Sequence, residues 1–244
     1  MKSKKIFTII LILAITATAG YFYLQTQQKI TIVTTTLPKI ITIQDVVIND
    51  STNPFVIKIT YPQIEGLDDF NQKAKVIVDK EISDFKTNSL ANDSAVKATD
   101  PTDYAKYPRT YELDISYTKG ETDNNVASVI FNIYNFEGGA HGASYYVPLN
   151  YDIKNKKMIA LADLFPSQPN YLQTISAFCM ADLTKQLTKA LGSLDGTTIQ
   201  DGAGPVAENF QFFLINPDNT ITFYFPQYQV AFGAAGDFKV TMPR

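Results

Sequence analysis

The single histidine of this 244-residue chain, His141, lies in a glycine-rich stretch, NFEGGAHGASYY, at residues 135–146. An imidazole exchanges protons near neutral pH, so a histidine on a flexible loop is a candidate general base. The neighbouring Gly138, Gly139 and Gly142 permit the left-handed backbone that tight turns need. His141 therefore acts either as a base or as a turn residue that bonds nearby backbone groups. The sequence favours the turn, because a turn alone accounts for the glycines.

A catalytic histidine needs chemical partners, and the sequence offers few. One histidine and one cysteine, Cys179, exclude a zinc site built from these residue types within one chain. Ser144 lacks the G-x-S-x-G pattern of a nucleophile elbow, and no glycine-rich phosphate loop occurs. We therefore predict no catalytic residue, no metal and no cofactor. The alternative is an envelope-acting hydrolase that uses His141 as general base.

The remaining titratable residues have structural explanations. Cys179 falls on the apolar face of a predicted helix, so we expect a buried, unreactive thiol. The acidic pairs could in principle supply the two carboxylates of a glycosidase. We interpret Asp68 and Asp69 as a helix start, and Asp100 and Asp103 as part of a polar loop.

The charge distribution excludes some partners. Three lysines stand within the first five residues, and from residue 21 onward 18 basic side chains face 24 acidic ones, a net charge of −6. An acidic body lacks the basic footprint that nucleic acid requires. It is compatible with a basic protein partner, and it is also an ordinary charge for solubility.

The N-terminus carries an export signal. A basic start is followed by an uncharged run that lasts until Lys29. Residues 1–24 are either a signal peptide, cleaved after Ala19, or a membrane anchor formed by the apolar residues 6–24. Both alternatives place the body outside the cytoplasm, because the lysines stay inside. Residues 25–44, rich in Thr and Gln, are expected to form a spacer.

Hydrophobic periodicity predicts the elements of the body. Helical spacing indicates two main helices, at residues 68–86 and 169–191, the second ending before Gly192. Residues 87–108 are polar and are predicted to be a loop. Alternation and β-rich composition predict strands at 55–64, 109–120, 126–136, 143–153, 209–215, 221–230 and 238–242. The expected fold is α+β, with mostly antiparallel sheets, two main helices packed on them, and an N-terminal signal or anchor helix before them.

Two segments carry a family resemblance. FEGGAHGASYYVPLNYDIKNKKMIALADLF and the C-terminal ITFYFPQYQVAFGAAGDFKVTMP resemble a bacterial extracytoplasmic domain family. This family includes the outer, lysozyme-sensing part of the anti-sigma factor RsiV and the N-terminal accessory region of the peptidoglycan deacetylase PdaC. The resemblance covers about residues 50–243 and implies a PdaC-type half at 45–147 and an RsiV-type half at 148–244. Gly142 stands where the family pattern has proline.

The resemblance implies a binding role. The sequence shows no sigma-factor-binding segment and no metal-binding histidines of a deacetylase domain, so neither activity is carried over. What it implies is an exported or membrane-anchored, non-catalytic module that contacts a lysozyme-like protein or peptidoglycan. The candidate ligand-binding residues are His141, Gly139, Tyr145, Tyr146 and Tyr228. The tyrosines form either a binding stripe or part of a core.

Overall fold

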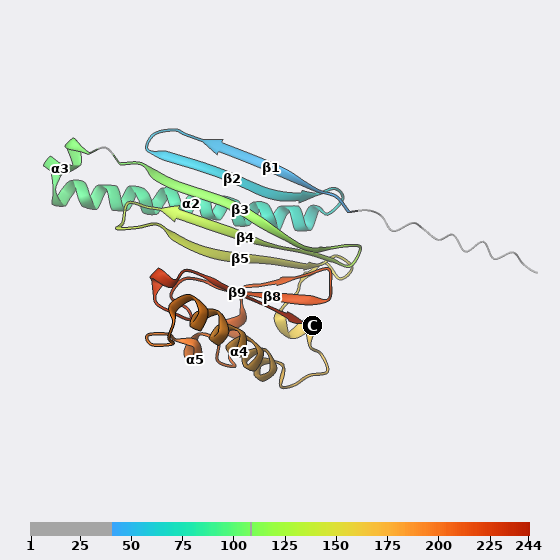
Figure 1. Ribbon diagram of the computed structural model, residues 1–244. Helices are drawn as coiled ribbons and strands as arrows, with labels where there is room; N and C mark the ends of the chain where they lie inside the picture. Colours follow the sequence, from blue (N-terminus) through green and yellow to red (C-terminus); the bar gives the residue numbers. More distant parts are fainter. Residues whose placement is uncertain (1–40, 108) are drawn as a thin grey trace, which may run out of the picture. The chain divides into compact units, whose positions relative to one another are not determined.

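A six-stranded sheet occupies the first half of the described chain (Figure 1). The computed structural model describes residues 41–107 and 109–244, so the predicted signal or anchor segment and spacer residues 25–40 lie outside the described residues. The strand order is β1-β2-β3-β4-β5-β6. The strands are β1 (Ile43–Asp50), β2 (Phe55–Ile64), β3 (Tyr111–Thr122), β4 (Val126–Phe136), β5 (Ala143–Asp152) and β6 (Lys157–Met158).

The sheet is mixed but mostly antiparallel, as predicted. β2 and β3 are parallel, with Ile57 opposite Leu113, while the other neighbouring strands run antiparallel. A parallel pair needs a long crossover connection. Helices α2 (Asp68–Thr99) and α3 (Pro101–Lys106) provide it. The α+β class is confirmed, and the strand β1 extends the sheet beyond the predicted elements.

Helix α2 covers one face of this sheet and is much longer than predicted (Figure 1). Its buried side chains include Phe70, Val78 and Phe85, which pack with Tyr151, Tyr111 and other residues of the sheet. The predicted loop at 87–108 is wrong over residues 87–99 and 101–106, which are helical. Polar composition was misleading there, because the segment holds no glycine or proline before Pro101 to end the helix.

Tertiary hydrogen bonds hold this polar end of α2. Asp93 accepts hydrogen bonds from the hydroxyl groups of Tyr104 at 2.7 Å and Tyr111 at 2.5 Å. These bonds connect α2 to α3 and to the start of β3. Because they stabilise the charged form, the two tyrosine hydroxyls lower the pKa of Asp93, the Tyr104 bond being the larger cause.

Asp93→Asn should therefore destabilise the protein at pH 7. It should also reduce the fall in the free energy of unfolding that occurs as the pH is lowered. A carboxyl group with a lowered folded-state pKa stabilises the fold above the ordinary aspartate pKa, about 3.9. That stability is lost as the pH falls through the folded-state value. Urea unfolding at a series of pH values between about 5 and about 2 gives the slope of the free energy of unfolding against pH. Identical slopes in the variant and the parent chain would contradict this role for Asp93.

The second half of the chain builds a smaller antiparallel sheet with its own core. Its order is β7-β8-β9, from β7 (Phe213–Ile215), β8 (Thr220–Phe225) and β9 (Phe238–Pro243). Helix α4 (Tyr171–Leu191) lies beside this sheet in Figure 1, and its side chains Ile175, Cys179 and Leu183, among others, belong to the same core. α4 ends before Gly192, which is left-handed with φ 79°, as the sequence predicts.

Short elements complete this half. They are η1 (Leu161–Leu164), α5 (Ile199–Gly202), η2 (Ala207–Phe210) and η3 (Gly233–Ala235).

In the described part of the chain, no helix is both long enough and apolar enough to cross a membrane.

The edge strand β7 packs against the face of the large sheet that α2 leaves open. Buried Ser128 and Asn150, on β4 and β5, serve as hydrogen-bonding partners for its backbone. The Ile215 N–H donates to Ser128 Oγ at 3.0 Å, and Asn150 Nδ2 donates to the Phe213 carbonyl at 2.9 Å. The Ser128 hydroxyl also donates to Asn150 Oδ1 at 2.6 Å. Side chains of the large sheet thus pair with the edge of the small one.

Candidate functional site

The part of this face that β7 does not cover is polar. Strand register places Lys58, Asp114, Tyr134 and Ser144 side by side across β2 to β5. The next rung holds Ser116, Asn132 and Tyr146. Successive strand residues alternate between faces, so the residues between these point into the core under α2. Two neighbouring rungs therefore present carboxylate, hydroxyl, amide and phenol groups together.

Two adjoining cavities lie over these rungs, and we call them together the open-face groove. One has a volume of about 200 Å³ and the other about 210 Å³. Asp114 and Tyr134 line both cavities, which places the two side by side. The first is also lined by Ser116, Asn132, Ile133, Ser144, Tyr145, Tyr146 and Asp237. The second is also lined by Val56, Lys58, Glu112 and Leu113.

Two carboxylates of the groove, those of Asp114 and Glu112, are available to a ligand. Asp114 and Glu112 are exposed and, among the described residues, make no side-chain hydrogen bond or ion pair. Lys58 lies beside Asp114 in the parallel register. An ionised carboxylate only accepts hydrogen bonds, and it has several acceptor positions to fill. Asp114 and Glu112 can therefore accept from hydroxyl or amino groups of a bound molecule.

Tyr146 forms the wall where the groove meets the small sheet. Its ring is only 8% exposed and packs 4.8 Å from the Tyr224 ring, while its hydroxyl donates to Asp237. The Lys239 ammonium lies 4.7 Å from the Tyr224 ring centre, a cation–π distance. Burial, followed by the bond to Asp237, raises the pKa of Tyr146, so this phenol stays protonated. It is a fixed wall rather than a proton-transfer group.

The glycine-rich loop between β4 and β5 borders the groove at Tyr134. Gly142 lies so close to the Tyr134 ring that a Cβ atom there would be 2.4 Å from the ring's Cε2. Gly138 has φ 89° and its carbonyl accepts a hydrogen bond from Arg109 at 3.2 Å. Asn92 of α2 donates to the Glu137 carbonyl at 2.9 Å. The loop is thus attached to α2 and to the start of β3.

His141 and Gly139 lie at the exposed tip of this loop. The ring Nδ1–H of His141 donates to the Gly142 carbonyl at 2.9 Å. In the described residues His141 has no hydrogen bond or ion pair with a carboxylate, hydroxyl or thiol group. The expectation that turn geometry explains the glycines holds for Gly138, whereas Gly142 is explained by ring packing. Gly139 has neither constraint, since its φ is not positive and a Cβ there would lie 3.9 Å from the nearest atom.

The three predicted tyrosines have different environments. Tyr146 lines the open-face groove. The neighbouring Tyr145 is also among the residues that line the groove, but its side chain reaches the opposite face, where its hydroxyl donates to Glu81 of α2. Tyr228 is 61% exposed in the loop after β8, with φ 73°, and it is not among the residues that line the groove. The structure thus places Tyr146 in the groove and Tyr228 outside it.

Sequence reasoning missed most of the groove. Its lining includes Asp114, Ser116, Asn132, Tyr134 and Asp237, none of which forms a motif. A weak signal exists in β3, where Glu112, Asp114 and Ser116 alternate with buried residues. Such alternation is normal for a sheet with one solvated face, so it does not by itself indicate a binding site.

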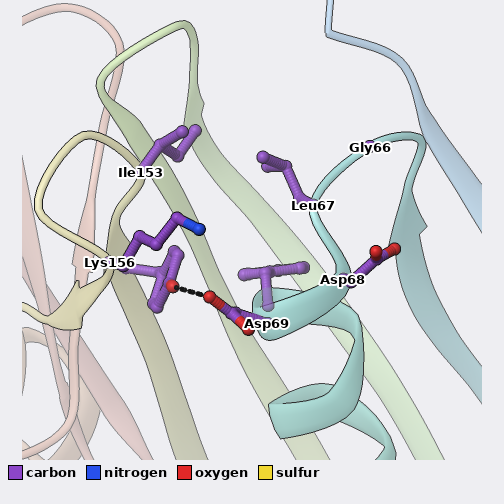
Figure 2. Close-up of a pocket in the computed structure, with 8 residues that line it drawn as sticks. Gly66, Leu67, Asp68, Asp69, Ile153 and Lys156 are labelled. Carbon is purple, nitrogen blue, oxygen red and sulfur yellow. Dashed lines mark hydrogen bonds between the residues drawn. The ribbon is translucent and has the colours of Figure 1, made fainter.

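A second pocket, of about 160 Å³, lies at the start of α2 (Figure 2). Its wall includes Asp68, Asp69, Tyr151 and Lys156. The Tyr151 hydroxyl donates to Asp69 at 3.3 Å, and a dashed line marks this bond at Asp69 in Figure 2. Neither aspartate caps the helix by a side-chain hydrogen bond, since the N-cap residue is Leu67. The pocket is smaller than the groove, and one of its carboxylates already has a partner.

Two further features, an apolar hollow and the buried Cys179, offer no reactive group. A hollow of about 400 Å³ lies between α2 and β5 and is lined mainly by apolar or aliphatic groups, namely Gln72, Lys73, Val76, Ile77, Leu149 and Met158. Cys179 is fully buried in the small core, and burial raises the pKa of its thiol to about 12. A thiol with such a pKa is not a nucleophile at neutral pH, as the sequence predicts.

The sequence matches known families in two consecutive segments. The family model described as "Deacetylase PdaC" matches residues 48–144, and that described as "Protein of unknown function (DUF3298)" matches residues 162–244. The chain is 26% identical over 197 residues to peptidoglycan-N-acetylmuramic acid deacetylase PdaC of Bacillus subtilis, covering 81% of this chain and 39% of that protein. It is 26% identical over 137 residues to Esterase Rv3036c of Mycobacterium tuberculosis, covering 55% and 57%. The chain thus spans only part of both relatives.

Solved structures have the same fold. A DUF3298 family member from Bacteroides fragilis superposes with a TM-score of 0.56 at 18% identity, covering 84% of this chain and 90% of that one. A DUF3298 family protein from Pseudomonas aeruginosa gives a TM-score of 0.55 at 12% identity, covering 83% and 90%. The two family matches and the relative from Bacillus subtilis support a PdaC-like DUF3298 domain family for residues 48–144 and 162–244, and the two solved structures show the same fold.

Proposed function

We propose that the chain is an extracytoplasmic, non-catalytic binding module whose ligand is a glycan of the bacterial cell envelope, held in the open-face groove. The observation that carries this proposal is the lining of the two adjoining cavities. It combines the carboxylates of Asp114 and Glu112, which have no partner among the described residues, hydroxyl and amide groups, and the rings of Tyr134 and Tyr146. Sugar hydroxyls donate to such acceptors, and the C–H face of a sugar packs on an aromatic ring.

The envelope setting has two supports. The relative from Bacillus subtilis is named as a deacetylase of peptidoglycan, and 81% of this chain aligns with it. Residues 1–24 have the composition of a signal peptide or membrane anchor, and either would place the groove outside the cytoplasm. Peptidoglycan is therefore the glycan that we propose.

A lysozyme-like protein is the other partner that the family resemblance implies. The net charge of −6 beyond residue 21 would steer a basic enzyme toward the chain. A stable protein interface, however, buries about 800 Å² on each partner. The groove itself consists of two cavities of about 200 and 210 Å³, a size that suits sugar rings. We therefore assign the groove to the glycan.

The alternative is a hydrolase that uses His141 as general base. Its support is the relative named as an esterase and the position of Ser144, which lines the groove three residues after His141. Against it, the described residues include no hydrogen bond between His141 and Ser144 or a carboxylate. General-base catalysis needs the base within hydrogen-bond reach of the proton that it removes, directly or through one water.

Titration calorimetry of the full chain with a soluble GlcNAc–MurNAc disaccharide, and separately with lysozyme, tests the proposal. We expect the disaccharide to bind with a dissociation constant between about 10 µM and about 1 mM. The double variant Asp114→Ala/Asn132→Ala should bind at least about tenfold more weakly, since two polar contacts are lost. The matched control is Gln63→Ala/Glu65→Ala, an exposed amide and acid outside the groove, which should bind as the parent chain does.

Four results would contradict the proposal. The first is no heat of binding with the saccharide at millimolar concentration, and the second is equal binding by the groove variant. The third is binding of lysozyme in place of the saccharide, which would assign the module to a protein partner. The fourth is turnover of the saccharide or of an ester substrate that His141→Ala abolishes, which would establish the hydrolase instead.

A further inference from the structure

The two cavities of the open-face groove are similar in size but differ in their walls. The cavity of about 200 Å³ is lined by hydroxyl, amide and phenol groups, with Asp237 at its edge. The cavity of about 210 Å³ has Lys58 and Glu112 beside the aliphatic Val56. A chain of sugars lying in the groove would therefore meet two different environments in succession.

Tyr134 stands between these environments. It lines both cavities together with Asp114, and its side chain is 39% exposed. Its strand neighbours are Asp114 on β3 and Ser144 on β5. An aromatic ring at the boundary between two cavities can contact both of two consecutive sugars, whereas a single sugar contacts one side.

Gly142 determines where the Tyr134 ring lies. A Cβ atom at Gly142 would be 2.4 Å from both Cε2 and the hydroxyl oxygen of Tyr134, closer than non-bonded atoms approach. The φ angle of Gly142 is not in the left-handed region, so the close approach of the ring, rather than the turn, favours glycine there. Any larger residue at 142 would displace the ring from the boundary.

We propose that the open-face groove has two subsites for consecutive sugars, that Tyr134 is the specificity-determining wall between them, and that Gly142 is the positioning residue for Tyr134. The ligand is then a glycan of at least two units, bound in one direction because the two cavities differ. This inference rests on the proposed function and adds to it the minimum length of the ligand. It also assigns a role to the glycine-rich loop, whose histidine lies outside the groove.

The first test compares saccharides of increasing length on the full chain. The parent chain should bind a GlcNAc–MurNAc disaccharide at least about tenfold more tightly than N-acetylglucosamine alone. Gly142→Ala should reduce disaccharide affinity about tenfold, toward the monosaccharide value, and should change monosaccharide affinity little. The control is Gln63→Ala/Glu65→Ala, two exposed residues outside the groove, and it should bind both saccharides as the parent chain does.

A double-mutant cycle shows whether Gly142 acts through Tyr134. Tyr134→Ala should reduce disaccharide affinity as Gly142→Ala does, and the double variant should lose no more than either single variant. Tyr134→Phe keeps the ring and should preserve the preference for the disaccharide. If Gly142→Ala does not fold, Tyr134→Ala and Tyr134→Phe carry the test, because the ring is partly exposed.

A spectroscopic reading separates positioning from general stability. The sequence contains no tryptophan, so Tyr134→Trp introduces a single reporter at the boundary. Its emission should shift on addition of the disaccharide, and this shift should be lost when Gly142→Ala is added.

Two outcomes distinguish the inference from the proposed function. If both saccharides bind with equal affinity, or if Gly142→Ala and Tyr134→Ala leave the length preference unchanged, the two-subsite inference is wrong and the glycan-binding proposal stands. If neither saccharide binds, both are wrong.

Discussion

Replacing Gly120 by alanine should lower the free energy of unfolding by about 3 kcal/mol, comparable with severe overpacking of a core. Gly120 lies on β3 where the small sheet meets the large one. A Cβ atom there would lie 2.3 Å from the Ile215 carbonyl oxygen and 2.8 Å from Leu214 Cδ1. The first of these atoms is backbone of β7, so it cannot move aside as the end of a flexible side chain does. The methyl group would push the two sheets apart.

Urea unfolding of the full chain measures this effect. Gly139→Ala is the matched control, since it makes the same chemical change in an exposed loop and should alter stability by no more than about 0.5 kcal/mol. Equal stability of Gly120→Ala and the parent chain would show that β7 does not approach β3 as closely as this packing requires.

Asn150→Ala should destabilise the protein by about 2–3 kcal/mol, because two buried hydrogen bonds are lost together. The Phe213 carbonyl loses its donor and the Ser128 hydroxyl loses its acceptor. Both Ser128 and Asn150 are almost fully buried, so water does not replace either partner without cost.

A double-mutant cycle with Ser128→Ala tests whether the two residues act as one unit. Their interaction energy should be about 1 kcal/mol or more, whereas independent sites add within about 0.5 kcal/mol. The control Asn49→Ala changes an exposed asparagine on β1 and should have little effect. Strict additivity of Ser128→Ala and Asn150→Ala would contradict the proposed pairing of β7 with these side chains.

The sequence predicted those helices and strands whose hydrophobic periodicity and terminating residues lie within the element itself. α4 was predicted within two residues of its observed bounds, Tyr171–Leu191, because its apolar face repeats at helical spacing and Gly192 ends it. The end of α2 was missed because its helical state depends on distant partners. Asp93 bonds to Tyr111, and Asn92 bonds to Glu137, which is 45 residues away in the sequence.

The groove was missed for a related reason. Asp114 and Tyr134 lie side by side only through the register of β3 and β4, and Tyr146 meets Asp237 across 91 residues. The glycine-rich loop drew attention to His141, the residue with the most versatile chemistry. The structure instead connects the loop to the groove through Gly142, a residue with no side chain, whose importance depends on the position of the Tyr134 ring.

Amide chemical-shift mapping of the isotope-labelled full chain, titrated with the GlcNAc–MurNAc disaccharide, tests the central claim most directly. A glycan in the open-face groove should shift the signals of Asp114, Ser116, Asn132 and Tyr134 most strongly, with saturation at millimolar concentration or below. The signals of Asp69 and Lys156, in the pocket at the start of α2, should stay unchanged. Shifts confined to that pocket or to the loop around His141, or no shifts at all, would contradict glycan binding in the groove.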